Sequence, residues 1–285
     1  MRSHRYWRVV GLGVLLAILI WLPAWAGPGE ERSTRELRVC ADPNNLPFSN
    51  ERREGFENKI AELIARELNA TVRYTWWAQR RGFIRNTLRA KECDVVMGVP
   101  SDFELVLPTK PYYRSTYVFL YRKDRGFDFR TLDDPILRQI KIGVHLIGDD
   151  YTNPPPAHAL AGRQIISNVV GYTIYGDYRQ ENPPARIIEA VAAGDLDVAI
   201  IWGPLAGYFA KQQSVAMQIV AVPPDPALPR LPFVFDIALG VRKGEAAFKG
   251  ELEEILHRKQ AEIQTILQEY GVPLLGAGMP SNSPG

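Results

Sequence analysis

The chain has 285 residues, of which 46% are hydrophobic and 23% charged, as in a packed globular protein rather than a disordered one. The formal net charge is +2, but Arg2, Arg5 and Arg8 lie in the first eight positions. Without these three, 31 Lys and Arg stand against 32 Asp and Glu. A nearly neutral chain argues against nucleic acid as a partner and against attachment to membranes through basic charge.

The first 26 residues predict a cleaved export signal. The three arginines precede an apolar stretch at residues 9–22, Pro23 ends that stretch, and Ala24 and Ala26 fit a small-x-small cleavage site. The alternative is an uncleaved anchor, but the stretch is shorter than the ~20 residues that a membrane-spanning helix needs. We therefore expect a periplasmic protein that has no membrane attachment after cleavage.

The first third of the remaining chain alternates between strands and helices. We expect strands at residues 37–41, 72–76 and 94–98, helices at 56–68 and 83–90, and a turn-rich segment at 42–48. Such a β-α-β-α-β run requires parallel strands with right-handed crossovers.

The rest of the chain predicts a second unit and a return to the first. A long extended segment leaves the first unit, and a proline-dense connector precedes the return. The expected elements are the extended segment 109–122, a strand at 140–145, a Pro-rich loop at 153–156, the connector 223–232, a strand at 233–241 and a final helix at 245–270.

One pattern occurs twice, at residues 86–100 and 188–204: a short helix, a tight turn and a buried strand that ends near Gly or Pro. Two copies imply two similar α/β lobes, and open α/β sheets bind ligands beyond the carboxyl ends of their strands. We therefore predict two lobes joined by a two-strand hinge, with a cleft between them. The expected boundaries are 37–121 with 233–275 for lobe 1, 122–232 for lobe 2 and 276–285 for a flexible tail.

The two cysteines, Cys40 and Cys93, leave two interpretations open. An exported chain favours a disulfide. However, Cys40 is near the exit end of one predicted strand and Cys93 precedes the entry end of another, so their Cα atoms could lie beyond the ~7 Å limit for a bridge. The alternative is a pair of buried thiols. The cysteines and histidines show no zinc-ligand spacing, and no metal site is predicted.

Several long strings carry a resemblance to a known family. They are CADPNNLPFSN (40–50), GFENKIAELIARELNA (55–70), YTWWAQRRGFIRNTLRAKECDVVMGVP (74–100) and TKPYYRSTYVF (109–119). The chain resembles the type II periplasmic solute-binding proteins (family 3-like), and within them the MoxJ/XoxJ-type branch associated with quinoprotein dehydrogenases. The resemblance implies a periplasmic-binding-protein-like type II fold and a non-enzymatic accessory or maturation partner of a PQQ-dependent methanol or alcohol dehydrogenase. PQQ and its metal would belong to that partner, and this chain would bind no cofactor.

The sequence lacks both charged residues with which the amino-acid binders of this family recognise the α-carboxylate and the α-ammonium of their ligand. In those binders an Arg before the Pro-Tyr segment grips the α-carboxylate, whereas here that place falls near Asp102, and residues 93–109 contain no Arg or Lys. In lobe 2 an Asp that receives the α-ammonium is replaced by the apolar run that starts at Trp202. A free amino acid is therefore not the expected ligand.

The candidate cleft residues in lobe 1 each have a structural alternative. Asp42, Asn44 and Asn45 follow the first strand and serve either recognition or an Asx-type turn. Trp76 and Trp77 point to opposite faces of a strand, so Trp77 is the one expected in the cleft.

Charged candidates follow the second and third strands. Arg80 and Arg81 would meet an anionic ligand or an acidic partner, or else form a solvated face. Ser101 and Asp102 follow the third strand.

Lobe 2 supplies the remaining candidates. Trp202 is the strongest, because the repeat places it opposite Asp102 across the hinge. His145 and the neighbouring Asp149 end the first strand of lobe 2, where His145 is either a ligand contact or a packed histidine. Tyr117 either binds or supports the hinge.

Three functions fit these observations. The first is the dehydrogenase accessory, whose cleft holds a partner segment or a small ligand. The second is the substrate-binding component of an ABC transporter that delivers a small non-amino-acid solute to its permease. The third and most remote is a dehydratase with a carboxyl general acid. No catalytic residue is assigned, because no nucleophile–base motif or phosphate loop is present.

Overall fold

The structure is a computed structural model that describes residues 35–147, 153–173, 178–225 and 228–276. They belong to one compact unit, Thr34–Gly285. The predicted export signal at 1–26 and nearly all of the predicted tail lie outside the described residues. Within the described ranges, no helix combines the length and apolarity required to cross a membrane.

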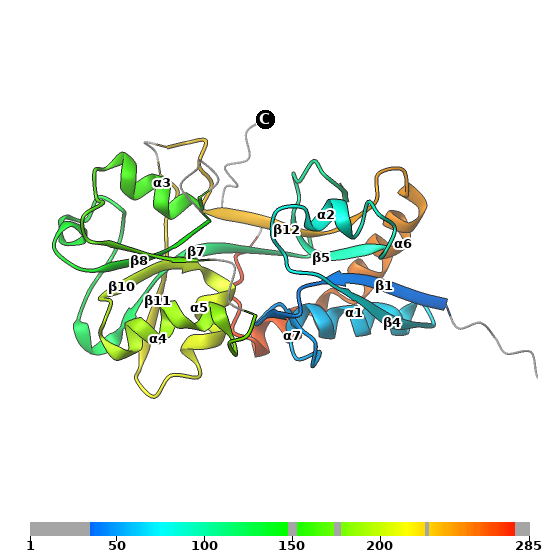
Figure 1. The fold of residues 1–285 in the computed structure, drawn as a ribbon, viewed down its shortest axis with the longest axis horizontal. Coiled ribbons are helices and arrows are strands. Elements are labelled where there is room, and N and C mark those ends of the chain that lie inside the picture. The colour runs from blue at the N-terminus through cyan, green and yellow to red at the C-terminus, as the bar shows by residue number, and fades with distance from the viewer. Residues whose placement is uncertain (1–34, 148–152, 174–177, 226–227, 277–285) are drawn as a thin grey trace, which may run out of the picture. The chain divides into compact units, whose positions relative to one another are not determined.

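A ten-stranded sheet runs through this unit in the order β4-β1-β5-β12-β7-β10-β8-β9, with β11 beside β7 and β6 beside β12 (Figure 1). The strands are β1 Arg35–Ala41, β4 Ala70–Trp76, β5 Val95–Pro100, β6 Leu107–Pro108, β7 Tyr113–Arg122, β8 Ile142–Leu146, β9 Val169–Thr173, β10 Val198–Trp202, β11 Met217–Ala221 and β12 Val234–Val241. A separate small hairpin joins β2 Asn44–Asn45 to β3 Ser49–Asn50.

Lobe 1 contains β4, β1, β5 and β12. Strand β1 pairs in parallel with both β4 and β5, which confirms the predicted β-α-β-α-β run. Helix α1 (Phe56–Glu67) packs with α6 (Ala246–Arg258) and α7 (Gln260–Glu269) on a core that includes Ile60, Leu252 and Leu267. The C-terminal helices therefore pack on lobe 1.

Lobe 2 contains β10, β8, β9 and β11. Its sheet lies between two apolar clusters, one that includes residues of α4 (Arg186–Ala193) and α5 (Gly203–Ala210) and one that includes residues of α3 (Pro155–Gly162). Three 3₁₀ turns, Lys123–Arg125, Pro135–Arg138 and Pro183–Ala185, complete it.

Two antiparallel strands connect the lobes, as predicted (Figure 1). The first part of β7, up to Thr116, pairs with β12 of lobe 1, and its second part, from Tyr117, pairs with β10 and β11 of lobe 2. The change of partner between these neighbouring residues places the hinge in the middle of β7. The residue boundaries predicted for the lobes stay a prediction.

Three predicted elements differ from the structure. The helix expected at 83–90 is only α2 (Phe83–Asn86), because the backbone of Thr87 leaves helical geometry (φ −119°, ψ −80°) while its hydroxyl donates to the Phe83 carbonyl. The final helix is two helices, separated where Lys259 leaves helical geometry. The Pro-rich segment opens α3, since proline is accommodated in the first turn of a helix.

Cys40 and Cys93 are joined by a disulfide, with their Cα atoms 5.4 Å apart. The geometric objection to the bridge assumed an extended approach to β5. Instead, the chain bends before that strand, and the Asp94 N–H donates to the Arg38 carbonyl at 2.7 Å. This bend brings Cys93 back beside β1, within the range that a disulfide spans.

An ion pair ties the two connecting strands together. Arg114 of β7 donates to Asp236 of β12 through two hydrogen bonds of 2.7 Å, and each side chain is only 18% exposed. We expect Asp236→Ala to lower the free energy of unfolding in urea by about 2 to 3 kcal/mol, the value of charge-assisted hydrogen bonds with little solvent.

Asp128 supplies the matched control. Its pair with Arg130 is 75–80% exposed, and Asp128→Ala should cost less than ~0.5 kcal/mol. Equal losses in the two variants would mean that the β7–β12 pair is no stronger than a surface contact.

Candidate functional site

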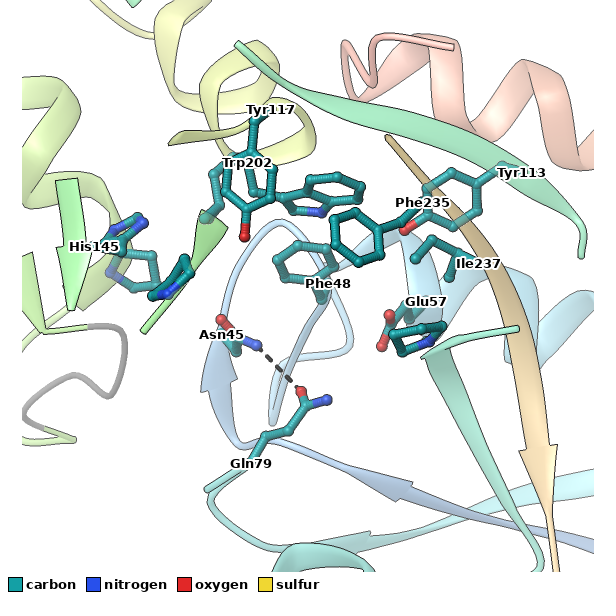
Figure 2. A pocket seen from close by; sticks show the side chains of 15 residues that line it. Asn45, Phe48, Glu57, Gln79, Tyr113, Tyr117, His145, Trp202, Phe235 and Ile237 are labelled. Atoms are coloured by element: carbon teal, nitrogen blue, oxygen red, sulfur yellow. Dashed lines mark hydrogen bonds between the residues drawn. The ribbon is translucent and has the colours of Figure 1, made fainter. Parts of the chain in front are cut away.

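A pocket of about 350 Å³ lies between the lobes, at the carboxyl ends of β5 and β10 and beside the connecting strands (Figure 2). Five of its lining side chains are aromatic and come from both lobes and from the strands between them: Phe48, Tyr113, Tyr117, Trp202 and Phe235. Its polar side chains are Asn45, Glu57, Gln79 and His145.

Three of the five aromatic side chains come from the connecting strands β7 and β12. Tyr113 and Tyr117 are four residues apart on β7, so they share a face, and Phe235 of the neighbouring β12 faces the same side. Trp202 ends β10 opposite Tyr117 in the ladder. The ring centroids of Trp202 lie 5.3 Å from Tyr117 and 5.7 Å from Phe235, which are contact distances for aromatic pairs.

Glu57 is the acidic group of the pocket. It lies in the first turn of α1, where its own N–H donates to the Phe48 carbonyl at 3.0 Å. Its carboxyl makes no hydrogen bond or ion pair with any described residue and lies over Gly98 of β5, where a Cβ would overlap it. Burial and the charge of nearby Asp42 raise the pKa of Glu57 to about 8, so it is mostly protonated at neutral pH.

The other titratable groups of the pocket are also uncharged. Burial lowers the pKa of His145, at the end of β8, to about 4, so its imidazole is neutral. Burial also raises the pKa values of Tyr113 and Tyr117, so both hydroxyls stay protonated. Among the described residues that line the pocket there is no Arg or Lys. A ligand carboxylate would therefore meet no cation here, in agreement with the sequence-based departure from amino-acid binders.

Asp42 and Asn44 are not among the residues that line the pocket. Asp42 is 3% exposed, and its carboxylate accepts from the N–H groups of Asn44 (2.9 Å) and Gln79 (2.7 Å) and from the Tyr178 hydroxyl (2.7 Å). Asn44 donates to the Gln180 carbonyl at 2.8 Å. The bond from the Asn44 N–H to the Asp42 carboxylate is the predicted Asx-type turn. The contacts to Tyr178 and Gln180 link lobe 1 to lobe 2.

Four of the other candidates line the pocket: Asn45, Tyr117, His145 and Trp202 (Figure 2). The side-chain amide of Asn45 donates to Gln79 Oε1 at 3.4 Å. Trp77 does not; it is 43% exposed, and its neighbour Trp76 packs against the core of lobe 1.

The charged candidates of lobe 1 lie elsewhere. Arg80 and Arg81 line a second pocket, beside α2, with Phe103 and Leu105. Asp102 is exposed and does not face Trp202.

The chain after β5 explains the place of Asp102. The Ser101 N–H donates to the Asp236 carbonyl at 2.9 Å, so the backbone continues along β12 instead of turning toward lobe 2. Asp149 lies outside the described residues. Among those described, no three His, Cys, Asp or Glu side chains are grouped to hold a metal ion.

Sequence reasoning missed Phe48, Glu57, Gln79 and Phe235 as pocket residues. Glu57 had a usable signal, because it directly follows Gly55 and Phe56 at the predicted helix start. An acidic residue in a first helical turn is ordinarily explained by the helix dipole, so the signal was not specific.

Trp202→Ala should open the pocket at a modest cost in stability. Trp202 is half-buried and packs against the cores of both lobes, so we expect a loss of about 2 kcal/mol in the free energy of unfolding, below the 3–5 kcal/mol of a buried Trp. Urea denaturation measures it, with Trp77→Ala as the exposed control that should lose under ~0.5 kcal/mol. A loss of 4 kcal/mol or more would assign Trp202 to the core.

Residues 37–273 match the bacterial extracellular solute-binding proteins, family 3. MoxJ of Methylorubrum extorquens is 31% identical over 92% of this chain and 93% of its own length, and MoxJ of Paracoccus denitrificans is 30% identical over 85% and 90%.

Solved structures give the same result. The periplasmic binding protein XoxJ from Methylobacterium extorquens AM1 superposes with a TM-score of 0.69 at 37% identity, covering 84% of this chain and 99% of that one. An arginine-bound amino acid ABC transporter substrate-binding protein from Streptococcus pneumoniae superposes at 0.58 with 16% identity, covering 85% and 95%. The latter likeness concerns the fold alone. Together they confirm the predicted type II binding-protein fold.

Proposed function

We propose that this chain, which belongs to the bacterial extracellular solute-binding proteins of family 3 and is of MoxJ/XoxJ type, is a periplasmic accessory of a PQQ-dependent dehydrogenase. The observation that carries the proposal is the pocket with five aromatic side chains and no Arg or Lys among its described lining residues, in a chain similar to MoxJ and XoxJ over most of its length. The pocket holds a partner segment or a small ligand.

The fold supplies a binding motion rather than a reaction. Closure at the middle of β7 brings His145 and Trp202 of lobe 2 against Phe48 and Glu57 of lobe 1, around whatever lies in the pocket. In this proposal PQQ and its metal stay with the partner, and the chain performs no chemical step.

Affinity purification of the mature protein from its own periplasm tests the proposal. Mass spectrometry should find the quinoprotein dehydrogenase in the eluate, and Trp202→Ala should retain less of it, whereas Trp77→Ala should retain the normal amount. A permease and its solute in place of the dehydrogenase would overturn the proposal.

A transporter binding protein is the second candidate, and the size of the pocket favours it. A volume of about 350 Å³ lies in the range of small-molecule sites. This function predicts tight one-to-one binding of a solute that is released when the purified protein is denatured. Mass spectrometry of the released fraction distinguishes the two candidates.

A further inference from the structure

We infer that the pocket between the lobes recognises an alkylammonium group, with the ammonium on the Glu57 carboxyl and its apolar body against the aromatic wall. The source of the group is a free organic amine or the lysine side chain of a partner segment. The inference rests on the proposed function in one respect, that this pocket is the binding site.

The first argument is the position of Glu57. Its carboxyl borders the pocket and has no partner among the described residues. Glu57 is partly buried, so its carboxyl keeps only limited access to water, and a ligand that supplies hydrogen-bond donors can satisfy it. The Glu57 carboxyl fits here because residue 98 of β5 is glycine. A Cβ at this position would overlap Glu57 Oε1 and displace the carboxyl.

The second argument is the sign of the surrounding charge. Asp42 lies close enough to raise the pKa of Glu57, and no described Arg or Lys lines the pocket. His145, also in the wall, is neutral, and the Tyr112 and Tyr113 hydroxyls near Glu57 keep their protons. The local potential therefore favours a cation and opposes a carboxylate, which excludes a zwitterion as the preferred ligand.

The third argument is the aromatic wall. Aromatic faces attract ammonium groups, most strongly where water is excluded, and they also cover apolar carbon. The rings of Phe48, Trp202 and Phe235 group together on one side of the pocket, and Glu57 lies toward Ile237 (Figure 2). A cation at Glu57 can thus extend its carbon body over the rings.

Binding of a cation should release a proton. In the empty pocket Glu57 is mostly protonated at pH 7, whereas beside an ammonium the carboxylate form is favoured. The released proton marks the residue that pairs with the ligand, because no other titratable group among the described lining residues has a pKa near 7.

Calorimetric titration of the mature protein at pH 7 tests the inference with benzylammonium chloride, its neutral analogue benzyl alcohol and its anionic analogue benzoate. We expect benzylammonium to bind at least tenfold more tightly than the other two. Titrations in phosphate and in Tris should differ by the heat of most of one proton released per ligand, because Glu57, with a pKa of about 8, is mostly protonated at pH 7. Benzyl alcohol or benzoate binding as tightly as benzylammonium would overturn the inference.

The two sources of the ammonium are separated with a peptide. The sequence Gly-Leu-Lys-Leu-Gly is compared with the same peptide carrying norleucine in place of lysine. Tighter binding of the lysine peptide than of benzylammonium identifies a partner side chain as the source, and the reverse order identifies a free amine. Equal binding of the two peptides and no binding of benzylammonium would overturn the inference.

Three variants assign the effect to Glu57. Glu57→Gln should weaken benzylammonium binding by tenfold or more and remove the buffer dependence. Gly98→Ala should do the same while keeping the carboxyl, because it displaces the Glu57 side chain. Glu62→Gln, on the same helix and outside the pocket, should change neither. Thermal melting of each variant verifies that it is folded.

Unchanged affinity in Glu57→Gln would overturn the inference. If benzylammonium fails to bind while the dehydrogenase still co-purifies, the inference alone fails and the proposed function stands. If a folded protein neither binds the amine nor retains the dehydrogenase, both fail.

Discussion

Replacing Cys40 and Cys93 together by serine is expected to lower the free energy of unfolding by about 4 kcal/mol. The disulfide joins residues 53 positions apart, and the entropy that such a loop removes from the unfolded chain corresponds to this value. In a chain of this length the melting temperature should fall by roughly 10 °C.

Calorimetry of the double variant and of the native protein in dithiothreitol should give the same loss, since both remove the bridge. The double variant itself should not respond to dithiothreitol. A change of less than ~1 kcal/mol would show that the bend before β5 already restricts the chain without the bridge.

Glu57→Gln is expected to raise the free energy of unfolding of the ligand-free protein by about 2 kcal/mol at pH 7.5. The pKa of Glu57 is raised from 4.5 to about 8 in the folded protein, so between these values the unfolded chain has lost the proton and the folded chain keeps it. Stability therefore falls as the pH rises through this window. The three pH units between 4.5 and 7.5, at about 1.4 kcal/mol each, set an upper limit of about 4 kcal/mol on this gain, and water in the open pocket reduces it.

Urea denaturation at pH 4, 6 and 7.5 measures the effect as a difference from the unsubstituted protein. The comparison must be made at each pH, because His145, with its pKa lowered to about 4, adds stability as the pH rises from 4 to 6.5. The gain should vanish at pH 4, where both states are protonated, and Glu62→Gln should show none. A constant difference at all three pH values would contradict the assignment.

Much of the fold was predictable, because long periodic segments determine their own structure. The helix predicted at 56–68 is α1, the strand predicted at 233–241 is β12, and the repeat correctly identified β5 and β10 as buried strands. Predictions failed where a local hydrogen bond decided the outcome, as at Thr87, or where proline opened a helix at Pro155.

The pocket was less predictable, because its walls come from segments that are remote in sequence. The paired residues Arg114 and Asp236 are 122 positions apart, and their register on β7 and β12 decides which rings face the cavity. The repeat correctly predicted that Trp202 lines the pocket but wrongly predicted the same for Asp102. The two lobes have similar strands, whereas the backbone that follows those strands differs between them. Similarly, the disulfide depends on the bend at Asp94, and the hydrophobic pattern of the sequence does not predict that bend.

The position of β12 has a consequence for biogenesis. This strand begins at Val234, yet it lies between β5 and β7, in the interior of the sheet. A nascent chain that has emerged only as far as the preceding connector lacks this central strand, and the edges of β5 and β7 are left without their partner. Lobe 1 can therefore reach its final form only after most of the polypeptide has been synthesised.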